Sequence, residues 1–350
     1  MNGKTQVFSS GVVAALAAAL LFGASTPLAK ILLRDVGPWL LAGLFYLGSG
    51  IGLTLWRALT RAAPVHLSRG ETGWLAAAIL SGGVVAPVLL MFGLTGMPAS
   101  GAALLLNAEG VLTALLAWVV FMENFDHRIA FGMAAIAAGA IVLSWPGEAH
   151  FAGALPALAI LGACLAWGID NNLTRKVSLT DASWIAAVKG LAAGSVNIAL
   201  AFALGDRLPD LPTTAAAMLV GLLAYGVSLV LFVIGMRHLG TARSGAYFSV
   251  APFFGALLAL ATGEPLTLRL TVAGVFMVIG IWLHLTEWHE HQHIHEVMEH
   301  SHEHAHDEHH QHAHDIPVVP GVKHTHRHWH EPLVHTHAHF PDSHHREHSH

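Results

Sequence analysis

Apolar residues of this chain fall into ten long stretches between residues 10 and 286, and short polar or charged segments separate them. The hydrocarbon core of a bilayer is about 30 Å thick, and an α-helix needs roughly 20 apolar residues to cross it. Each stretch is close to that length, so the pattern predicts ten transmembrane helices. They are expected at 10–31, 37–56, 73–94, 98–121, 128–145, 152–170, 184–205, 214–236, 243–262 and 268–286.

The composition is that of a membrane protein. Hydrophobic residues make up 54% of the chain and charged residues only 11%, whereas a soluble domain carries about 25% charged residues. The first apolar stretch continues to Leu33, which is long enough to span the bilayer, so we expect it to be retained rather than cleaved. Cys164 is the single cysteine, so no disulfide can form within the chain.

The distribution of basic residues predicts an orientation. Lys and Arg collect on the cytoplasmic side of membrane proteins. One side holds the N-terminus, the loops after the second, fourth, sixth and eighth predicted helices, and the C-terminal tail; before the tail it carries Lys4, Arg57, Arg61, Arg69, Arg128, Arg175, Lys176, Arg237 and Arg243. The other side carries Lys30, Arg34, Arg207 and Arg269. We therefore expect both termini in the cytoplasm.

The two halves of the apolar region repeat each other at an offset of 141 to 145 residues. Residues 22–30 align with 167–175, Ser100-Gly101-Ala102 with Ser244-Gly245-Ala246, and Glu123 with Glu264. These landmarks predict two five-helix units, 10–145 and 152–286. Because five is odd, the second unit must enter the membrane in the opposite sense, as in the inverted repeats of many secondary transporters.

Three motifs carry a family resemblance. An aromatic-Gly pair occurs in the first and sixth predicted helices, as Phe22-Gly23 and Trp167-Gly168, and the second unit ends with Pro252 followed by Gly263-Glu264. With the tandem five-helix units, these motifs resemble the EamA-type transporters of the drug/metabolite transporter superfamily over residues 10 to 286. The resemblance implies an all-α membrane fold of ten helices with both termini inside, and export or exchange of small solutes. It names no particular substrate.

Six polar residues within or at the end of predicted helices are candidates for contact with substrate or a coupling ion, because an ionised side chain at the bilayer centre costs about 2.5–3.5 kcal/mol. They are Asn107, Glu109, Asp170, Asn171, Lys189 and Asn197. We interpret Glu109, midway along the fourth helix, as the coupling carboxylate. The structural alternative pairs Glu109 with Lys189 and uses the asparagines for helix packing. Asp170 could instead cap a helix or pair with Arg175, and Lys189 could extend to the membrane surface.

Two further glutamates, Glu123 and Glu264, lie at helix ends in equivalent places of the two units. On one interpretation, each glutamate caps a helix or contacts an arginine at the membrane surface. On the other, the two glutamates act as gates on opposite faces of the membrane. We expect no enzyme, because the chain has no nucleotide-binding Gly-x-x-x-x-Gly-Lys loop, no His-Glu-x-x-His run and no nucleophile elbow.

The tail, residues 289–350, carries 23 of the 28 histidines of the chain. The candidate metal ligands are His289, His291, His293, His295, His300, His302, His304, His306, His309, His310, His312, His314, His324, His326, His328 and His330. Imidazole together with carboxylate suits Zn, Ni, Co and Cu(II). The sequence therefore predicts that the tail binds a divalent metal such as Zn, Ni or Co and that no other cofactor is required. Because aliphatic runs are nearly absent, we expect the tail to be disordered without metal.

Three functional hypotheses follow from the sequence. The first is a secondary transporter, an exporter of small solutes, with a metal-binding tail. The second is efflux of Ni, Co or Zn through the helices, and the third is a membrane-anchored metal buffer or sensor without transport. The expected location is a bacterial inner membrane, and the expected partners are lipid and a small-molecule or metal-ion substrate, with no nucleic acid. The sequence leaves the solute, the coupling ion and the oligomeric state open.

Overall fold

The computed structural model describes residues 10–65, 67–121, 127–144, 154–174, 177, 181–239, 247–285, 290–295, 298–304, 324–330 and 333–338. The chain divides into two compact units. The first, Met1–Thr286, is helical where it is described, and the described residues of the second, Glu287–His350, form strands.

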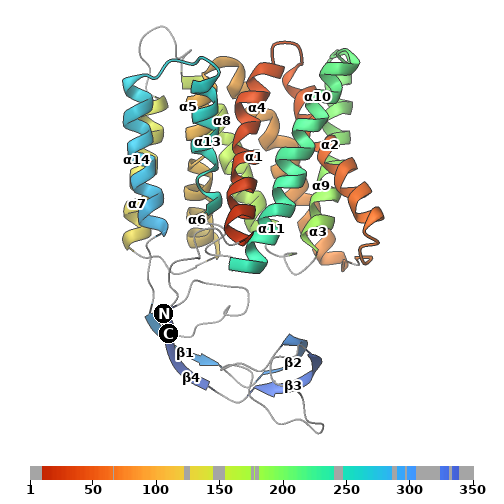
Figure 1. The fold of residues 1–350 in the computed structure, drawn as a ribbon, viewed down its shortest axis with the longest axis vertical. Coiled ribbons are helices and arrows are strands. Elements are labelled where there is room, and N and C mark those ends of the chain that lie inside the picture. Colours follow the sequence, from red (N-terminus) through yellow and green to blue (C-terminus); the bar gives the residue numbers. More distant parts are fainter. Residues whose placement is uncertain are drawn as a thin grey trace. The chain divides into compact units, whose positions relative to one another are not determined.

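Helices account for nearly all described residues of the first unit (Figure 1). The first half contains α1 (Ser10–Leu32), α2 (Pro38–Leu59), α3 (Arg69–Ala78), the π-helix η1 (Ile79–Val85), α4 (Ala86–Gly96), α5 (Ala99–Leu105), α6 (Ala108–Phe121) and α7 (His127–Ser144). The second half contains α8 (Ala154–Thr174), α9 (Ala182–Ala203), α10 (Leu211–Gly221), the π-helix η3 (Leu222–Val227), α11 (Ser228–Leu239), α13 (Ala251–Ala261) and α14 (Leu268–Leu285).

Within the described residues, six helical segments are long and apolar enough to cross a membrane. They are Gly11–Leu32, Pro38–Leu59, Arg69–Gly96, Ala154–Thr174, Ala182–Ala203 and Leu211–Gly235. Shorter apolar helices occupy Ala130–Leu143, Ala251–Ala261 and Leu268–Leu283. The helical membrane fold is confirmed, and the count of ten spans stays a prediction.

The helices begin where local chemistry satisfies their first backbone N–H groups. Pro38 opens α2, a position at which the missing N–H costs nothing. Ser68 and Glu71 form a reciprocal capping box at the start of α3. Asp181 and Asp210 cap α9 and α10 by accepting backbone N–H groups of the first turn.

Packing between the two halves is reciprocal. Helix α1 packs on α11 and α13 of the second half, while α8 packs on α4 and α6 of the first. The equivalent helices α2 and α9 pack on each other, and so do α7 and α14, which lie side by side in Figure 1. This exchange of partners is the arrangement that two structurally equivalent halves make around a two-fold axis.

Glycines of the repeated motif stand where helices from different halves are in contact. A Cβ at Gly255 of α13 would lie 2.7 Å from the carbonyl oxygen of Gly23 in α1. The equivalent Gly168 of α8 faces the backbone of Leu112 and Thr113 in α6. The aromatic-Gly signature therefore marks two of the contacts between the halves, because small residues let helix backbones touch.

Two irregular features recur at equivalent places of the halves. The π-helices η1 and η3 interrupt the third and eighth predicted spans, 142 to 143 residues apart. The fourth predicted helix was expected to be continuous over 98–121, and that prediction was wrong, because a turn at Leu106 and Asn107 separates α5 from α6. The Asn107 side chain donates to the Leu104 carbonyl at 2.9 Å, which offers that carbonyl a partner outside the helix ladder. A turn at Ser249 and Val250 precedes α13 in the other half.

A salt bridge joins α2 and α9 at one end. Arg57 Nη1 lies 2.7 Å from Asp181 Oδ2 and donates to Ser183 Oγ at 2.6 Å. Partial burial alone would raise the pKa of Asp181, but hydrogen bonds from Ser183 and Arg57 lower it to about 2. The ordinary value is about 3.9.

We expect the energetic coupling of Arg57 to Asp181 to vanish in acid. A carboxylate with a lowered folded-state pKa stabilises the protein above its unfolded pKa, and this contribution is lost as the pH falls from about 4 through about 2. Because 42% of the Asp181 side chain is exposed, the coupling at neutral pH should stay below about 1 kcal/mol. Thermal unfolding of Arg57→Gln, Asp181→Asn and the double variant at several pH values measures it. A coupling that persists unchanged at about pH 2 would contradict the assignment.

Four short strands are described in the second unit. They are β1 (Glu290–His295), β2 (Met298–His304), β3 (His324–His330) and β4 (Leu333–Ala338), paired antiparallel as β1 with β4 and β2 with β3. At these segments the structure differs from the predicted disorder. The physical reason is local: β-branched or aromatic residues such as Ile294, Thr325, Trp329 and Val334 alternate with histidines along the strands. The predicted ligands His289, His306, His309, His310, His312 and His314 lie outside the described residues.

Candidate functional site

An ion pair is buried between α8 and α9. Lys189 Nζ lies 2.6 Å from each carboxylate oxygen of Asp170, and the two side chains are only 16% and 7% exposed. Thr174, one turn after Asp170, donates to the same carboxylate at 2.8 Å. The structure therefore corrects two alternatives: Lys189 pairs with Asp170 rather than with Glu109, and it does not extend to the membrane surface.

The π-helix η1 forms one wall of this ion pair. A Cβ at Gly82 would overlap the Asp170 carboxylate, so only glycine leaves the space that Asp170 fills. The Gly82 carbonyl accepts hydrogen bonds from Tyr46 Oη at 2.7 Å and from Trp167 Nε1 at 3.0 Å. Because a π-helical turn alters the regular pairing of carbonyls, these buried donors find an acceptor inside the helical unit.

A second polar pair lies beside the first, between α6 and α8. Asn171 Nδ2 donates to Glu109 Oε1 at 2.9 Å and to Thr113 Oγ1 at 3.3 Å. Asn172 ties the same helices together by donating to the Thr113 carbonyl at 3.2 Å. Glu109 is half-buried and Asn171 is exposed, in contrast to the buried ion pair. We call Glu109, Asn171, Asp170 and Lys189 the polar cluster.

The polar cluster is built from the ends of three helices. Glu109 lies just after the turn that separates α5 from α6, Asp170 and Asn171 lie in the last turn of α8, and Lys189 lies in the second turn of α9. Glu109 also lies in the first turn of α6, where the positive end of the helix dipole favours a carboxylate.

The cluster has a formal charge of −1, because Asp170 and Lys189 neutralise each other and Glu109 is not matched within it. A carboxylate hydrogen-bonded by one amide keeps lone pairs free for a proton, a cation or a donor group. The arrangement is therefore suited to exchanging a proton or holding a positively polarised solute, with Asn171 as an orienting donor.

The other two predicted asparagines do not join the cluster. Asn107 is buried and donates to the Leu104 carbonyl, with Met277 Sδ at 3.6 Å. Asn197 is fully buried and donates to the Gly83 carbonyl at 3.1 Å. Among the described residues its Oδ1 has no hydrogen-bond partner. Both asparagines secure the irregular helix segments that surround the cluster.

Glu264 caps a helix of the opposite half. Its carboxylate accepts the backbone N–H groups of Ala99, at 2.7 Å, and Ser100, at 2.9 Å, which open α5. Lys30 of α1 donates to the Leu94 and Thr95 carbonyls at the end of α4. One anion and one cation thus hold the turn between α4 and α5 from both sides. The equivalent Glu123 lies outside the described residues.

The sequence profile of the EamA-like transporter family matches residues 9–145 and 154–286 of this chain. The chain belongs to the EamA-like transporter family. The predicted resemblance to EamA transporters is confirmed, and with it an integral membrane protein and a transport rather than enzymatic kind of function.

Two individual comparisons agree with the family. The EamA-family chain is 28% identical over 295 residues to an uncharacterized transporter of Methanothermobacter thermautotrophicus, covering 78% of this chain and 85% of that protein. A solved crystal structure superposes with a TM-score of 0.59 at 20% identity, covering 79% of this chain and 96% of the other. At that identity, the second likeness shows the fold alone.

The transporter is asymmetric at the place equivalent to the polar cluster. Trp167 corresponds to Phe22 and Asp170 to Ser25. There the structure has an aromatic group instead of charges: Phe22 meets Tyr225 edge-on at 5.8 Å between ring centroids and Phe248 at 5.4 Å. The pseudo-symmetric halves therefore share a backbone plan but differ in chemistry, with the charges of the cluster on α6, α8 and α9.

Sequence reasoning did not assign a role in this site to Gly82 or Thr113. Adjacent glycines at 82 and 83 within an apolar stretch were the available signal, since such a pair permits a close approach or an irregular turn. Which side chains use that space depends on the neighbouring helices, and the order of residues along the chain does not specify it.

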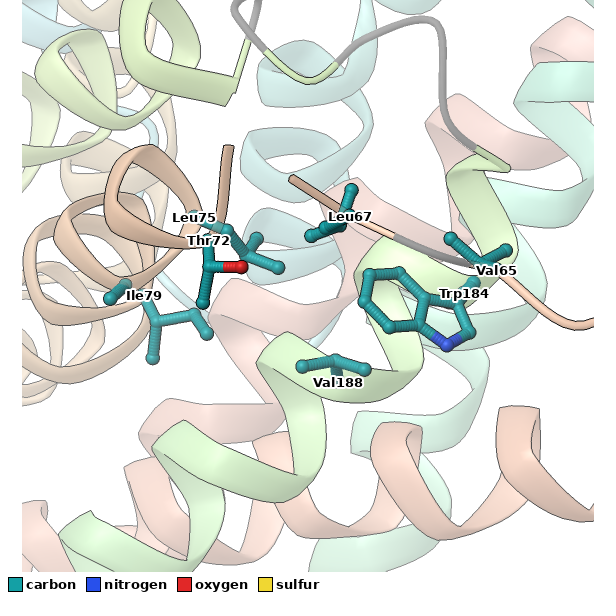
Figure 2. A pocket seen from close by; sticks show the side chains of 8 residues that line it. Val65, Leu67, Thr72, Leu75, Ile79, Trp184 and Val188 are labelled. Atoms are coloured by element: carbon teal, nitrogen blue, oxygen red, sulfur yellow. The ribbon is translucent and has the colours of Figure 1, made fainter. Parts of the chain in front are cut away.

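A separate open pocket of about 390 Å³ lies between the segment before α3, α3 itself and the start of α9 (Figure 2). It is lined by Val65, Leu67, Thr72, Leu75, Ala76, Ile79, Trp184 and Val188. The lining is apolar except for one threonine hydroxyl, and it includes no member of the polar cluster. It therefore has few groups with which to orient a polar solute.

Proposed function

We propose that this EamA-family protein is a secondary transporter that exports a small solute in exchange for protons, with Glu109 as the coupling carboxylate. The observation that carries the proposal is the hydrogen-bonded pair of half-buried Glu109 and exposed Asn171 beside the buried ion pair of Asp170 and Lys189. No ATP-binding loop is present in the sequence, so an ion gradient is the proposed energy source.

The exposure of Asn171 beside Glu109 supports a water-filled opening. An ionised carboxylate at the bilayer centre costs about 2.5–3.5 kcal/mol against lipid, and Asn171 is exposed next to it. We infer that this side of α6 and α8 faces an aqueous cavity, which is where transporters with inverted repeats bind substrate. Alternating access would then arise from rocking of the two halves along the glycine-rich contacts.

Proton exchange at Glu109 fits the local electrostatics. The ion pair supplies no net charge, so the cluster changes from −1 to neutral when Glu109 takes up a proton. A positively polarised solute and a proton would compete for the same carboxylate, and this competition is the minimal requirement for exchange. Glu264 and Lys30, which hold the turn between α4 and α5, are proposed to close one end of the pathway.

The tail supports a regulatory role for metal. We propose that its histidines bind a divalent ion such as Zn, Ni or Co in the cytoplasm, where the distribution of basic residues along the sequence predicts both termini. Metal bound there would regulate the helical unit according to the cytosolic metal concentration, or it would buffer that concentration. The solute would pass through the cavity between the helices.

The test of transport uses the purified full chain in proteoliposomes that contain a pH-sensitive dye and a pool of small metabolites. We expect release of at least one metabolite, measured by mass spectrometry and accompanied by proton movement. Glu109→Gln should reduce both by about tenfold or more, the usual scale for loss of a proton-transfer group. Glu71→Gln, the same chemical change at an exposed helix cap, is the matched control.

Three outcomes would contradict parts of the proposal. Equal release by Glu109→Gln and the control would remove Glu109 from coupling. Release of Zn²⁺, Ni²⁺ or Co²⁺ alone, in parallel vesicles with a metal-sensitive dye, would replace solute export with metal efflux. Absence of all flux from the wild-type chain would overturn transport by this chain.

A further inference from the structure

The open pocket of Figure 2 follows one face of α3. Its volume is about 390 Å³, within the range of about 300–1,000 Å³ that small-molecule sites occupy. Thr72, Leu75, Ala76 and Ile79 line one wall, and residues spaced by three, four and seven positions share a helix face. At 1.5 Å per residue, this wall extends about 10 Å along the helix axis. The lining therefore forms an apolar strip along the helix.

The opposite wall belongs to α9. Trp184 and Val188, one turn apart, supply it, and two apolar residues of the segment before α3 complete the lining (Figure 2). Both walls belong to segments long and apolar enough to cross a membrane, Arg69–Gly96 and Ala182–Ala203. Residues near the start of each segment line the pocket. The pocket therefore lies at the end of two spans, where lipid headgroups border the hydrocarbon core.

Three arginines lie at this end of the pocket. Arg69 is the first residue of α3 and precedes Thr72 by three positions, so it continues the lining face of the helix to its N-terminal end. Arg57, in the last turn of α2, donates to the Ala63 carbonyl at 2.9 Å. This contact holds the segment that leads into the pocket lining against the end of α2. Arg61 is exposed within that segment.

The five charged residues at this end have a formal net charge of +1. Asp181 forms an ion pair with Arg57, and Glu71 accepts a backbone N–H group in the capping box of α3. Among the described residues, Arg61 and Arg69 are exposed and belong to no ion pair. Two guanidinium groups are therefore available to an anion that borders the apolar lining.

We propose that this pocket binds one anionic phospholipid, with an acyl chain along the apolar lining and the phosphate at Arg61 and Arg69. A guanidinium group matches the geometry of phosphate with two parallel N–H donors. Basic pockets between transmembrane helices are the kind of site that holds anionic headgroups. The lipid is a resident of the fold and not the transported solute, so the inference is independent of the proposed export and of Glu109.

The charge pattern favours a lipid over a second copy of the chain. A symmetric dimer uses the same patch on both subunits, so it would bring like-charged arginines of two copies to one interface. A zwitterionic lipid would fill the apolar lining but would leave the positive charge unmatched. An anionic phospholipid supplies an apolar chain and a negative charge together, at the level where the spans end.

A lipid in this pocket would contact two of the elements that enclose the buried ion pair. Val188 precedes Lys189, whose ammonium group pairs with Asp170. Ile79 opens η1, whose Gly82 leaves the space that the Asp170 carboxylate fills. A bound acyl chain would therefore hold α3 and η1 at a fixed distance from α9. Because a ligand that binds the folded state stabilises it, we expect the lipid to raise the unfolding temperature.

The test of the headgroup compares phosphatidylglycerol with phosphatidylcholine of the same acyl chains. Native mass spectrometry counts the lipids that remain on the full chain in detergent, and we expect the wild type to retain one phosphatidylglycerol in preference to phosphatidylcholine. Arg61→Gln with Arg69→Gln should weaken this binding by about fivefold for each arginine, the scale of one basic residue near an anionic membrane surface. Arg34→Gln with Arg207→Gln removes two exposed arginines outside the pocket and is the matched control.

The test of the apolar lining uses two neighbouring alanines of α3. Ala76 and Ala77 are both exposed, and of the two only Ala76 lines the pocket. Ala76→Trp should fill the space of the acyl chain and remove the retained lipid. The rise in unfolding temperature on addition of phosphatidylglycerol should disappear in the same variant. Ala77→Trp should behave as the wild type does in both measurements.

Other results would overturn the proposal. Equal retention of both lipids by the wild type would remove the charge selectivity, and unchanged retention by Ala76→Trp would place the lipid elsewhere. Displacement of phosphatidylglycerol by glycerol phosphate at equal concentration would indicate a site for a polar anion without a chain. A lipid-free dimer that Ala76→Trp dissociates would assign the pocket to a second copy. All these readouts measure binding and not flux, so they are separate from the test of transport.

Discussion

Replacing Lys189 with methionine is expected to destabilise the helical unit by about 3–5 kcal/mol, the usual cost of breaking a buried ion pair by removing one partner. The Asp170 carboxylate is 7% exposed and packs against α9 and η1, and among the described residues it would keep the Thr174 hydroxyl as its hydrogen-bond donor. Methionine fills a volume similar to that of the lysine stem, so the loss of stability would measure the removal of the positive charge rather than the creation of a cavity.

The double variant Asp170→Asn with Lys189→Met is the control for this prediction. It removes both charges and leaves no buried ion without a partner, so much of the lost stability should return. Thermal unfolding in detergent, followed by tryptophan fluorescence, measures both variants. A Lys189→Met protein as stable as the wild type would show that water reaches Asp170 freely, and the ion pair would then lose its structural role.

Replacing Gly190 with alanine is expected to have the second-largest effect, a destabilisation of about 1–3 kcal/mol from overpacking. A Cβ at Gly190 would lie 2.6 Å from both Cα and N of Gly50 and 2.8 Å from the Tyr46 carbonyl oxygen. These atoms belong to the backbone of α2, so no side chain can rotate away, and α2 and α9 must separate. The gain in helix propensity from glycine to alanine, about 1 kcal/mol, only partly offsets this cost.

The matched control is Gly73→Ala on α3, where an added Cβ meets nothing within 4 Å. It should be neutral or slightly stabilising through helix propensity. Because Lys189 is adjacent to Gly190, separation of α9 from α2 should also weaken solute flux in the proteoliposome assay. Wild-type stability and flux in Gly190→Ala would show that the α2–α9 interface is loose enough to accept a methyl group.

Much of the helical architecture was readable in the sequence because hydrophobic length and small-residue motifs are local properties. The second helix was expected to begin at residue 37 and α2 begins at Pro38, and the signature glycines Gly23 and Gly168 were visible as a pattern. The broken fourth span was not, because Asn107 within an apolar run is compatible with either a helix or a turn. The choice depended on a side chain returning to the Leu104 carbonyl.

The site was predicted as a set of residues but not as a set of pairs. Glu109 and Lys189 were both singled out, Glu109 as the coupling carboxylate, with pairing of the two as the structural alternative. In the structure Lys189 instead forms an ion pair with Asp170, because α8 and α9 bring those two side chains together. Glu109 accepts a hydrogen bond from Asn171. Glu264 likewise was expected at a helix end, but its partners, the N–H groups of Ala99 and Ser100, lie 165 and 164 residues away along the chain.

By itself, the sequence determined that this protein is a membrane-embedded, repeated helical transporter with a histidine-rich tail. The lengths of the apolar stretches, the offset between the two repeats and the residue composition all follow from the order of residues alone. Only the tertiary structure decided which charge neutralises which, where glycine backbones touch, and which histidines stand opposite each other. These properties depend on distances between segments far apart in the chain. Packing and register set those distances, and local sequence preferences do not determine them.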